Sequence, residues 1–68
     1  SIKAKEIRHT RVLDIRKKVL QGWKMEDLMG YCVTRLGVTH ATATSYIDEA
    51  AEPYRKKYQE VKLGLNKL

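Results

Sequence analysis

Two glycines and one proline divide this sequence into four segments, and this division limits the possible folds more than any other feature. Gly22 and Gly37 each follow a run of helix-forming residues, and Pro53 lies near the start of the last run. Glycine takes up the left-handed backbone that ends many helices, whereas proline fits only the first turn of a helix. We therefore expect helices over residues 4–20, 25–36, 40–51 and 53–65, joined by short turns.

Apolar residues recur at helical spacing in each of these segments. In the first, Val12, Ile15 and Val19 share a face that Leu13 and Leu20 widen. The other expected stripes are Leu28, Cys32 and Leu36, then Ala43, Tyr46, Ile47 and Ala50, and finally Tyr54, Tyr58, Val61 and Leu65. No segment shows the alternation of a strand. The sequence predicts an all-α fold, a small bundle of about four helices without a wing.

Four single residues carry local expectations. Trp23 is expected to pack across the break after the first helix, and the Thr39 hydroxyl to cap the third. Gly30 lies inside the second helix, where glycine costs about 1 kcal/mol relative to alanine, and this cost favours close packing at that point. Cys32 is most simply a small buried apolar side chain.

The size and composition of the chain exclude several classes of protein. Sixty-eight residues support a single domain, residues 1–68, with one small core and little room for an enclosed active site. Because the chain begins with Ser1 rather than Met, we allow for excision from a larger protein. No apolar run has the roughly 18 residues of a membrane span, and a lone thiol suits a reducing, intracellular location, cytoplasmic or nucleoid-associated.

No arrangement of side chains indicates catalysis or metal binding. The acidic residues are scattered, and the sequence has no glycine-rich phosphate-binding loop. His9, Cys32 and His40 lack the spacing of a zinc site, and both histidines are expected on the surface. We expect no enzyme activity from this domain alone and no cofactor.

The charge is distributed unevenly along the chain, which has a net charge of +6. Residues 1–24 carry eight basic and two acidic side chains, residues 25–52 one basic and five acidic, and residues 53–68 five basic and one acidic. Two basic flanks therefore enclose an acidic centre. A polyanion is a natural partner for such flanks, although charged helix faces are often simply solvated.

The middle of the chain resembles the helix-turn-helix of DNA-binding proteins. The resemblance begins at Gly22-Trp-Lys-Met-Glu-Asp-Leu28 and is densest in Arg35-Leu36-Gly37-Val38-Thr39, followed by Thr42-Ala43 and Tyr46-Ile47. Leu20-Gln-Gly22 ahead of Met25 is also usual in such tri-helical domains. In this pattern a leucine closes one helix, glycine permits the turn, valine fills the corner and threonine caps the next helix.

The resemblance implies a function and a set of contact residues. The third helix would lie in the major groove of double-stranded DNA, with His40, Ala41, Thr44 and Ser45 facing the bases. Phosphate contacts are expected from hydroxyl and basic side chains, namely Thr39, Thr42, Arg8, Arg11, Lys17, Lys18, Lys24, Arg55, Lys56 and Lys57. Such a domain would serve as a transcription regulator or as the DNA-targeting module of a recombination, replication or other nucleic-acid-processing protein.

Two features depart from the helix-turn-helix pattern. The stretch from Leu28 to Gly37 is about one helical turn longer than the compact form, and the third helix contains no Lys or Arg. Arg to guanine is the commonest specific base contact, so sequence-dependent and non-specific DNA binding both remain open.

Two alternatives concern protein partners. A protein-interaction or assembly module in a nucleic-acid machine would use the acidic surface of Asp48, Glu49 and Glu52. The stripe of Tyr54, Tyr58, Val61 and Leu65 fits either the core of a monomer or the seam of a homodimer.

Overall fold

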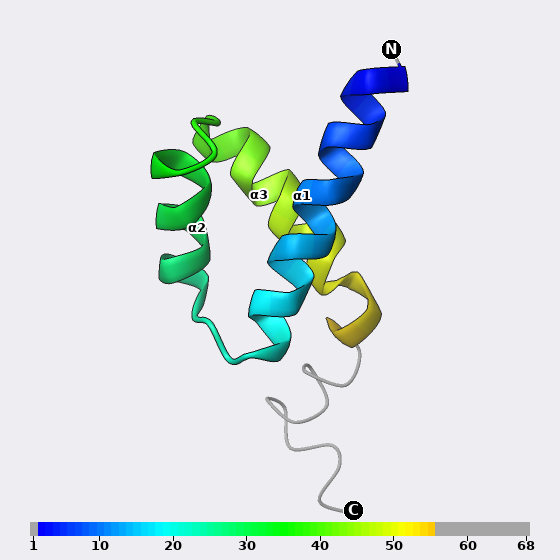
Figure 1. The fold of residues 1–68 in the computed structure, drawn as a ribbon. Helices are drawn as coiled ribbons and strands as arrows, with labels where there is room; N and C mark the ends of the chain where they lie inside the picture. The colour runs from blue at the N-terminus through cyan, green and yellow to red at the C-terminus, as the bar shows by residue number, and fades with distance from the viewer. Residues whose placement is uncertain (1, 56–68) are drawn as a thin grey trace, which may run out of the picture.

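The computed structural model describes residues 2–55 and contains four helical elements in this range. They are α1 (Ile2–Leu20), α2 (Met25–Thr34), α3 (His40–Ala51) and the short 3-10 helix η1 (Glu52–Tyr54). Helix α3 packs against both α1 and α2 (Figure 1). The described residues contain no strand, so the all-α prediction is confirmed for this part of the chain.

Helix boundaries agree with the sequence prediction at most ends. Helix α3 has the predicted bounds, and α1 ends at Leu20 as expected but begins at Ile2, two residues before the predicted start. Nothing in Ile2-Lys3 stops a helix, which explains the earlier start. Helix α2 ends at Thr34 rather than at residue 36. Its end widens, because the Tyr31 carbonyl accepts from the Arg35 amide, four residues later, and also from the Leu36 amide, five residues later.

Both glycines at the helix ends have the left-handed backbone that the sequence pattern requires. Gly22 has a φ of 90° and Gly37 a φ of 68°. At the end of α1 the Gly22 amide donates to the Val19 carbonyl and the Trp23 amide to the Lys18 carbonyl. This pair of hydrogen bonds is a Schellman motif, which satisfies carbonyl groups that the helix leaves unpaired.

The core lies where α3 meets the other two helices. Of the described residues, eight have side chains buried there: Val12, Ile15, Leu28, Cys32, Ala43, Tyr46, Ile47 and Ala50. Every apolar position predicted for α3 is among them. Burial also raises the pKa of the Cys32 thiol, since desolvation opposes the thiolate.

Three predictions about packing are wrong. Leu13 and Leu20 do not widen the buried stripe of α1, because their side chains lie on its outer face and are 41% and 64% exposed. Gly30 is not a site of close packing. Its position is exposed, and a Cβ there would meet no atom within 4 Å.

Only the start of the expected fourth helix lies within the described residues. Pro53 sits in η1, and Tyr54 is half-buried and lines a groove with Val19 and Leu28. Residues 56–68, including Tyr58, Val61 and Leu65, lie outside the described residues. Among the helices that are described, none combines the length and the apolar character required to cross a membrane.

Candidate nucleic-acid interface

The outer face of α3 carries the four side chains predicted to face bases. His40, Ala41, Thr44 and Ser45 are all exposed. The opposite face of the same helix is anchored in the core by Ala43 and Ile47. The structure thus places the predicted contact residues together on one solvent-facing surface, which we call the α3 outer face.

Two threonines hold the first turn of α3. The Thr39 Oγ1 accepts a hydrogen bond from the Thr42 amide at 3.2 Å, so the predicted N-cap is confirmed. The Thr39 hydroxyl donates in turn to the Thr42 Oγ1 at 3.2 Å. This arrangement leaves the Thr42 hydroxyl proton to act as a donor beside the helix N-terminus, where anions are favoured.

Two arginines of α1 reach across to α3. The Arg8 guanidinium donates from Nε and Nη2 to the Glu49 Oε1, at 3.0 and 2.8 Å, and from Nη2 to the Ser45 Oγ at 3.0 Å. It also lies 5.2 Å from the ring centre of Tyr46. The Arg11 Nη1 donates to the Tyr46 hydroxyl at 3.3 Å. Arg8 therefore borders the α3 outer face through Ser45, whereas Arg11 contacts the buried Tyr46.

The acidic residues of α3 and η1 are paired with arginines. Glu49 bonds Arg8, while the Arg55 guanidinium lies 3.2 Å from the Glu52 carboxylate and 3.8 Å from that of Asp48. Three of the five carboxylates of the acidic centre therefore lie beside arginines in the folded protein.

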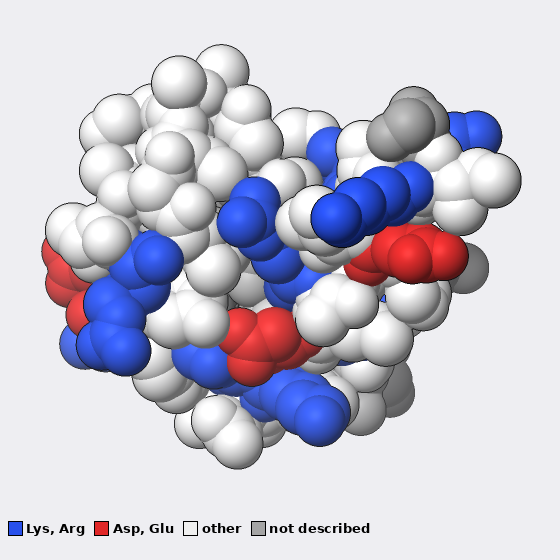
Figure 2. Space-filling view, turned by 45° about the horizontal axis from the view of Figure 1, so that its top comes forward, with Lys and Arg blue, Asp and Glu red and all other residues white. Residues whose placement is uncertain are grey.

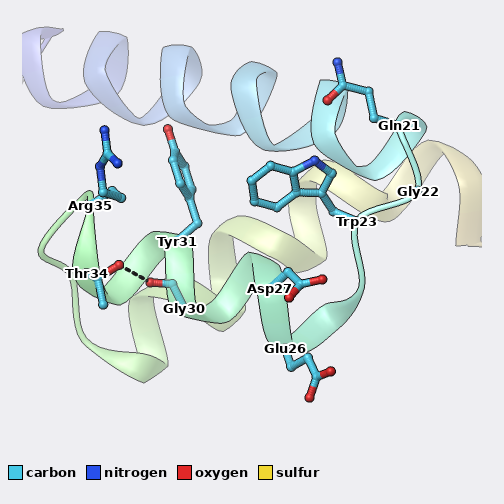
Figure 3. A pocket seen from close by; sticks show the side chains of 9 residues that line it. All are labelled: Gln21, Gly22, Trp23, Glu26, Asp27, Gly30, Tyr31, Thr34 and Arg35. Atoms are coloured by element: carbon cyan, nitrogen blue, oxygen red, sulfur yellow. Dashed lines mark hydrogen bonds between the residues drawn. The ribbon is translucent and has the colours of Figure 1, made fainter.

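Lys18 is turned away from the α3 outer face and joins α1 to α2. Its ammonium donates to Asp14 at 2.9 Å and lies 4.5 Å and 5.3 Å from the ring centres of Tyr31 and Trp23. Trp23 meets Tyr31 edge-on at 6.0 Å, which confirms that it packs across the break after α1. Figure 3 shows both rings pointing from α2 and the preceding loop toward α1.

The Asp14 carboxylate is the centre of this contact. Hydrogen bonds from the Tyr31 hydroxyl, at 2.7 Å, and from Lys18 lower the pKa of Asp14 below its usual 3.8. The hydrogen bond to Asp14 raises the pKa of Lys18 and that of Tyr31. Lys18 is thus a structural side chain, only 17% exposed, as well as a predicted phosphate contact.

Two of the remaining predicted phosphate contacts, Lys17 and Lys24, lie within the described residues. Lys17 lies on the outer face of α1 and Lys24 precedes α2, and both are exposed. Lys56 and Lys57 lie outside the described residues. Figure 2 shows Lys and Arg side chains at several separate places, with an uncharged area at its upper left. On the face shown, the basic side chains therefore do not form one continuous patch.

Sequence reasoning missed the polar contacts that join distant segments. The Arg16 guanidinium donates to the Glu49 and Ala50 carbonyls at the end of α3, both at 3.0 Å. Arg8 and Glu49 are 41 residues apart, so no local spacing reveals their pairing. Lys5 lies three residues before Arg8 on α1 and extends the same basic side. Lys5 was not among the predicted contact residues, although its helical spacing from Arg8 could have identified it.

The comparisons with known proteins add no functional information. No family model, curated protein or solved structure matches this chain. Within residues 2–55, no three or more His, Cys, Asp and Glu side chains form a cluster that could hold a metal ion.

Proposed function

We propose that this domain binds double-stranded DNA through α3, with α2 and α3 acting as a helix-turn-helix. The observation that carries the proposal is the arrangement of α3: its N-terminal residues are capped and exposed, its other face is buried, and Arg8 of α1 borders the exposed face. An exposed helix face flanked by cations fits the major groove, where base edges are read and phosphates lie on both sides.

The role of each residue follows from its position. His40, Ala41, Thr44 and Ser45 would face base edges, since they lie together on the α3 outer face. Thr39 and Thr42 would contact phosphate at the helix N-terminus, and Arg8 and Arg11 would border the groove. Electrostatic attraction to the DNA phosphates at longer range would come from Lys17, Lys24, Arg55 and the basic residues 56 and 57. The domain would act as a transcription regulator or as the DNA-targeting module of a larger nucleic-acid-processing protein.

The ion pairs favour DNA over the alternative of a protein partner. An acidic partner-binding surface needs carboxylates available to a basic partner, whereas Asp48, Glu49 and Glu52 already lie within 4 Å of Arg8 or Arg55. The same pairing reduces the repulsion that these carboxylates would exert on a DNA backbone.

Fluorescence anisotropy tests the proposal with two matched variants. Thr44 and Thr34 are both exposed helical threonines whose Oγ1 bonds the carbonyl four residues earlier, that of His40 or Gly30. Thr34 lies in the groove drawn in Figure 3, outside the α3 outer face. Thr44→Glu and Thr34→Glu therefore make the same chemical change at two surfaces.

We expect the unaltered domain to bind random duplex DNA more tightly than single-stranded DNA, with an affinity that falls steeply as salt rises. Thr44→Glu should weaken duplex binding by about tenfold or more, because it places a carboxylate against the groove, and Thr34→Glu by much less. No binding at low salt would refute the proposal, and equal losses for the two variants would exclude α3 as the interface.

A further inference from the structure

The α3 outer face lacks a guanidinium of its own, and Arg8 of α1 supplies one. The sequence contains no Lys or Arg between Leu36 and Tyr54. Arg8 crosses from α1 and donates from Nη2 to the Oγ of Ser45, one of the four side chains predicted to face bases. A side chain remote in sequence is therefore part of the candidate reading surface.

The contacts of Arg8 fix the orientation of its guanidinium. Its side edge, formed by Nε and Nη2, is held by the Glu49 Oε1 at 3.0 and 2.8 Å. The second proton of Nη2 is on the side of Nη1, and it points to the Ser45 Oγ. The terminal edge formed by Nη1 and Nη2 thus faces the Ser45 side. Tyr46, at 5.2 Å, supports the plane from beneath.

This geometry suits a planar acceptor pair. Two parallel N–H groups of an arginine match the O6 and N7 atoms of guanine in the major groove. A guanidinium already held by a carboxylate and a ring loses less conformational freedom on binding than a mobile one. The Ser45 hydroxyl can move aside to bond a neighbouring acceptor, which frees the second Nη2 proton for the base while Glu49 still holds the other edge.

We propose that Arg8, oriented by Glu49 and supported by Tyr46, determines specificity by reading a guanine at the edge of the α3 site. The inference rests on the proposed duplex binding and deepens it, because it names the base and the residue that selects it. Glu49 acts as a positioning residue. The absence of Lys and Arg from α3 is then compensated by α1.

The test is selection of duplexes from a randomised library with the unaltered domain and with Arg8→Lys, followed by affinity measurements on the selected site. Arg8→Lys keeps the charge but not the two parallel donors. We expect the unaltered domain to prefer guanine at one position by about fivefold to a hundredfold over other bases. Arg8→Lys should lose most of this preference while keeping the salt dependence of binding.

Glu49→Gln and Glu52→Gln form the second, matched arm of the test. Both remove one carboxylate charge near the end of α3, but Glu49 holds Arg8 whereas Glu52 lies 3.2 Å from Arg55. Glu49→Gln should weaken the guanine preference at the position that depends on Arg8, and Glu52→Gln should leave it unchanged. Circular dichroism verifies that each variant is folded.

The outcomes separate this inference from the proposed function. If the unaltered domain binds no duplex, the proposed function is wrong and the inference falls with it. Duplex binding without a guanine preference, or with the same preference after Arg8→Lys, would overturn the inference alone and leave Arg8 as a phosphate contact. Loss of preference in Arg8→Lys and Glu49→Gln, but not in Glu52→Gln, would establish it.

Discussion

Asp14 shows how one partly exposed carboxylate can join two helices. It accepts hydrogen bonds from Tyr31 of α2 and Lys18 of α1, and these bonds lower its pKa. A carboxyl whose pKa is lower in the folded state than in the unfolded state stabilises the fold above its unfolded pKa. That contribution is lost as pH falls through the folded pKa. The contact between α1 and α2 should therefore weaken in acid.

Asp14→Asn should lower the free energy of unfolding by about 1 kcal/mol at pH 7, a modest value because solvent screens a partly exposed pair. The difference from the unaltered protein should shrink as pH falls from 5 toward 2, where the native carboxyl also becomes protonated. Urea unfolding followed by circular dichroism measures it. Tyr31→Phe, which removes one donor and keeps the ring, should reproduce part of the effect. A difference independent of pH would contradict this account.

Two glycines in and after α2 differ in backbone conformation but not in available space. A Cβ at Gly30 or at Gly37 would meet no atom within 4 Å, yet only Gly37 has a positive φ, 68°. Gly30→Ala should raise stability by about 0.5–1 kcal/mol through helix propensity. Gly37→Ala should lower it by about 1–2 kcal/mol, because a side chain strains the left-handed backbone.

Thermal unfolding of both glycine variants checks this pair of predictions. For a domain of this size, 1 kcal/mol shifts the Tm by about 4–8 °C. The Tm should rise for Gly30→Ala and fall for Gly37→Ala. A lower Tm for Gly30→Ala would indicate a contact that the structure does not explain, and an unchanged Tm for Gly37→Ala would mean that the turn tolerates another backbone conformation.

Residues at the helix ends predicted the helix boundaries well. Which helix faces and which distant side chains contact one another did not follow from the sequence. The glycine stop after α1 and the Thr39 cap depend on neighbouring residues only, so both were predictable. Leu13 has the right spacing to extend the apolar stripe of α1, yet its side chain is exposed. Which side of the stripe is buried depends on where the neighbouring helix packs, and the spacing does not reveal this. The pairing of Arg8 with Glu49 likewise required the fold.

The three helices are held by an apolar centre and by polar contacts at its edge. Arg16 bonds carbonyls at the end of α3, and Asp14 joins α1 to Tyr31 of α2. Within residues 2–55, no buried side-chain nitrogen or oxygen lacks a hydrogen-bond partner. The polar contacts fix the relative positions of the helices, but the small core must supply most of the stability.

Ile15 lies fully buried in this core, at 0% exposure, and its truncation should remove most of the stability of the domain. Ile15→Ala costs about 2–5 kcal/mol, whereas a core of this size supplies about 3–5 kcal/mol in total. Ile15→Ala should therefore be largely unfolded at 25 °C, and Ile15→Val, which costs about 0.5–1.5 kcal/mol, should remain folded. Circular dichroism with urea titration measures both. A stably folded Ile15→Ala would mean that contacts outside this core carry the fold.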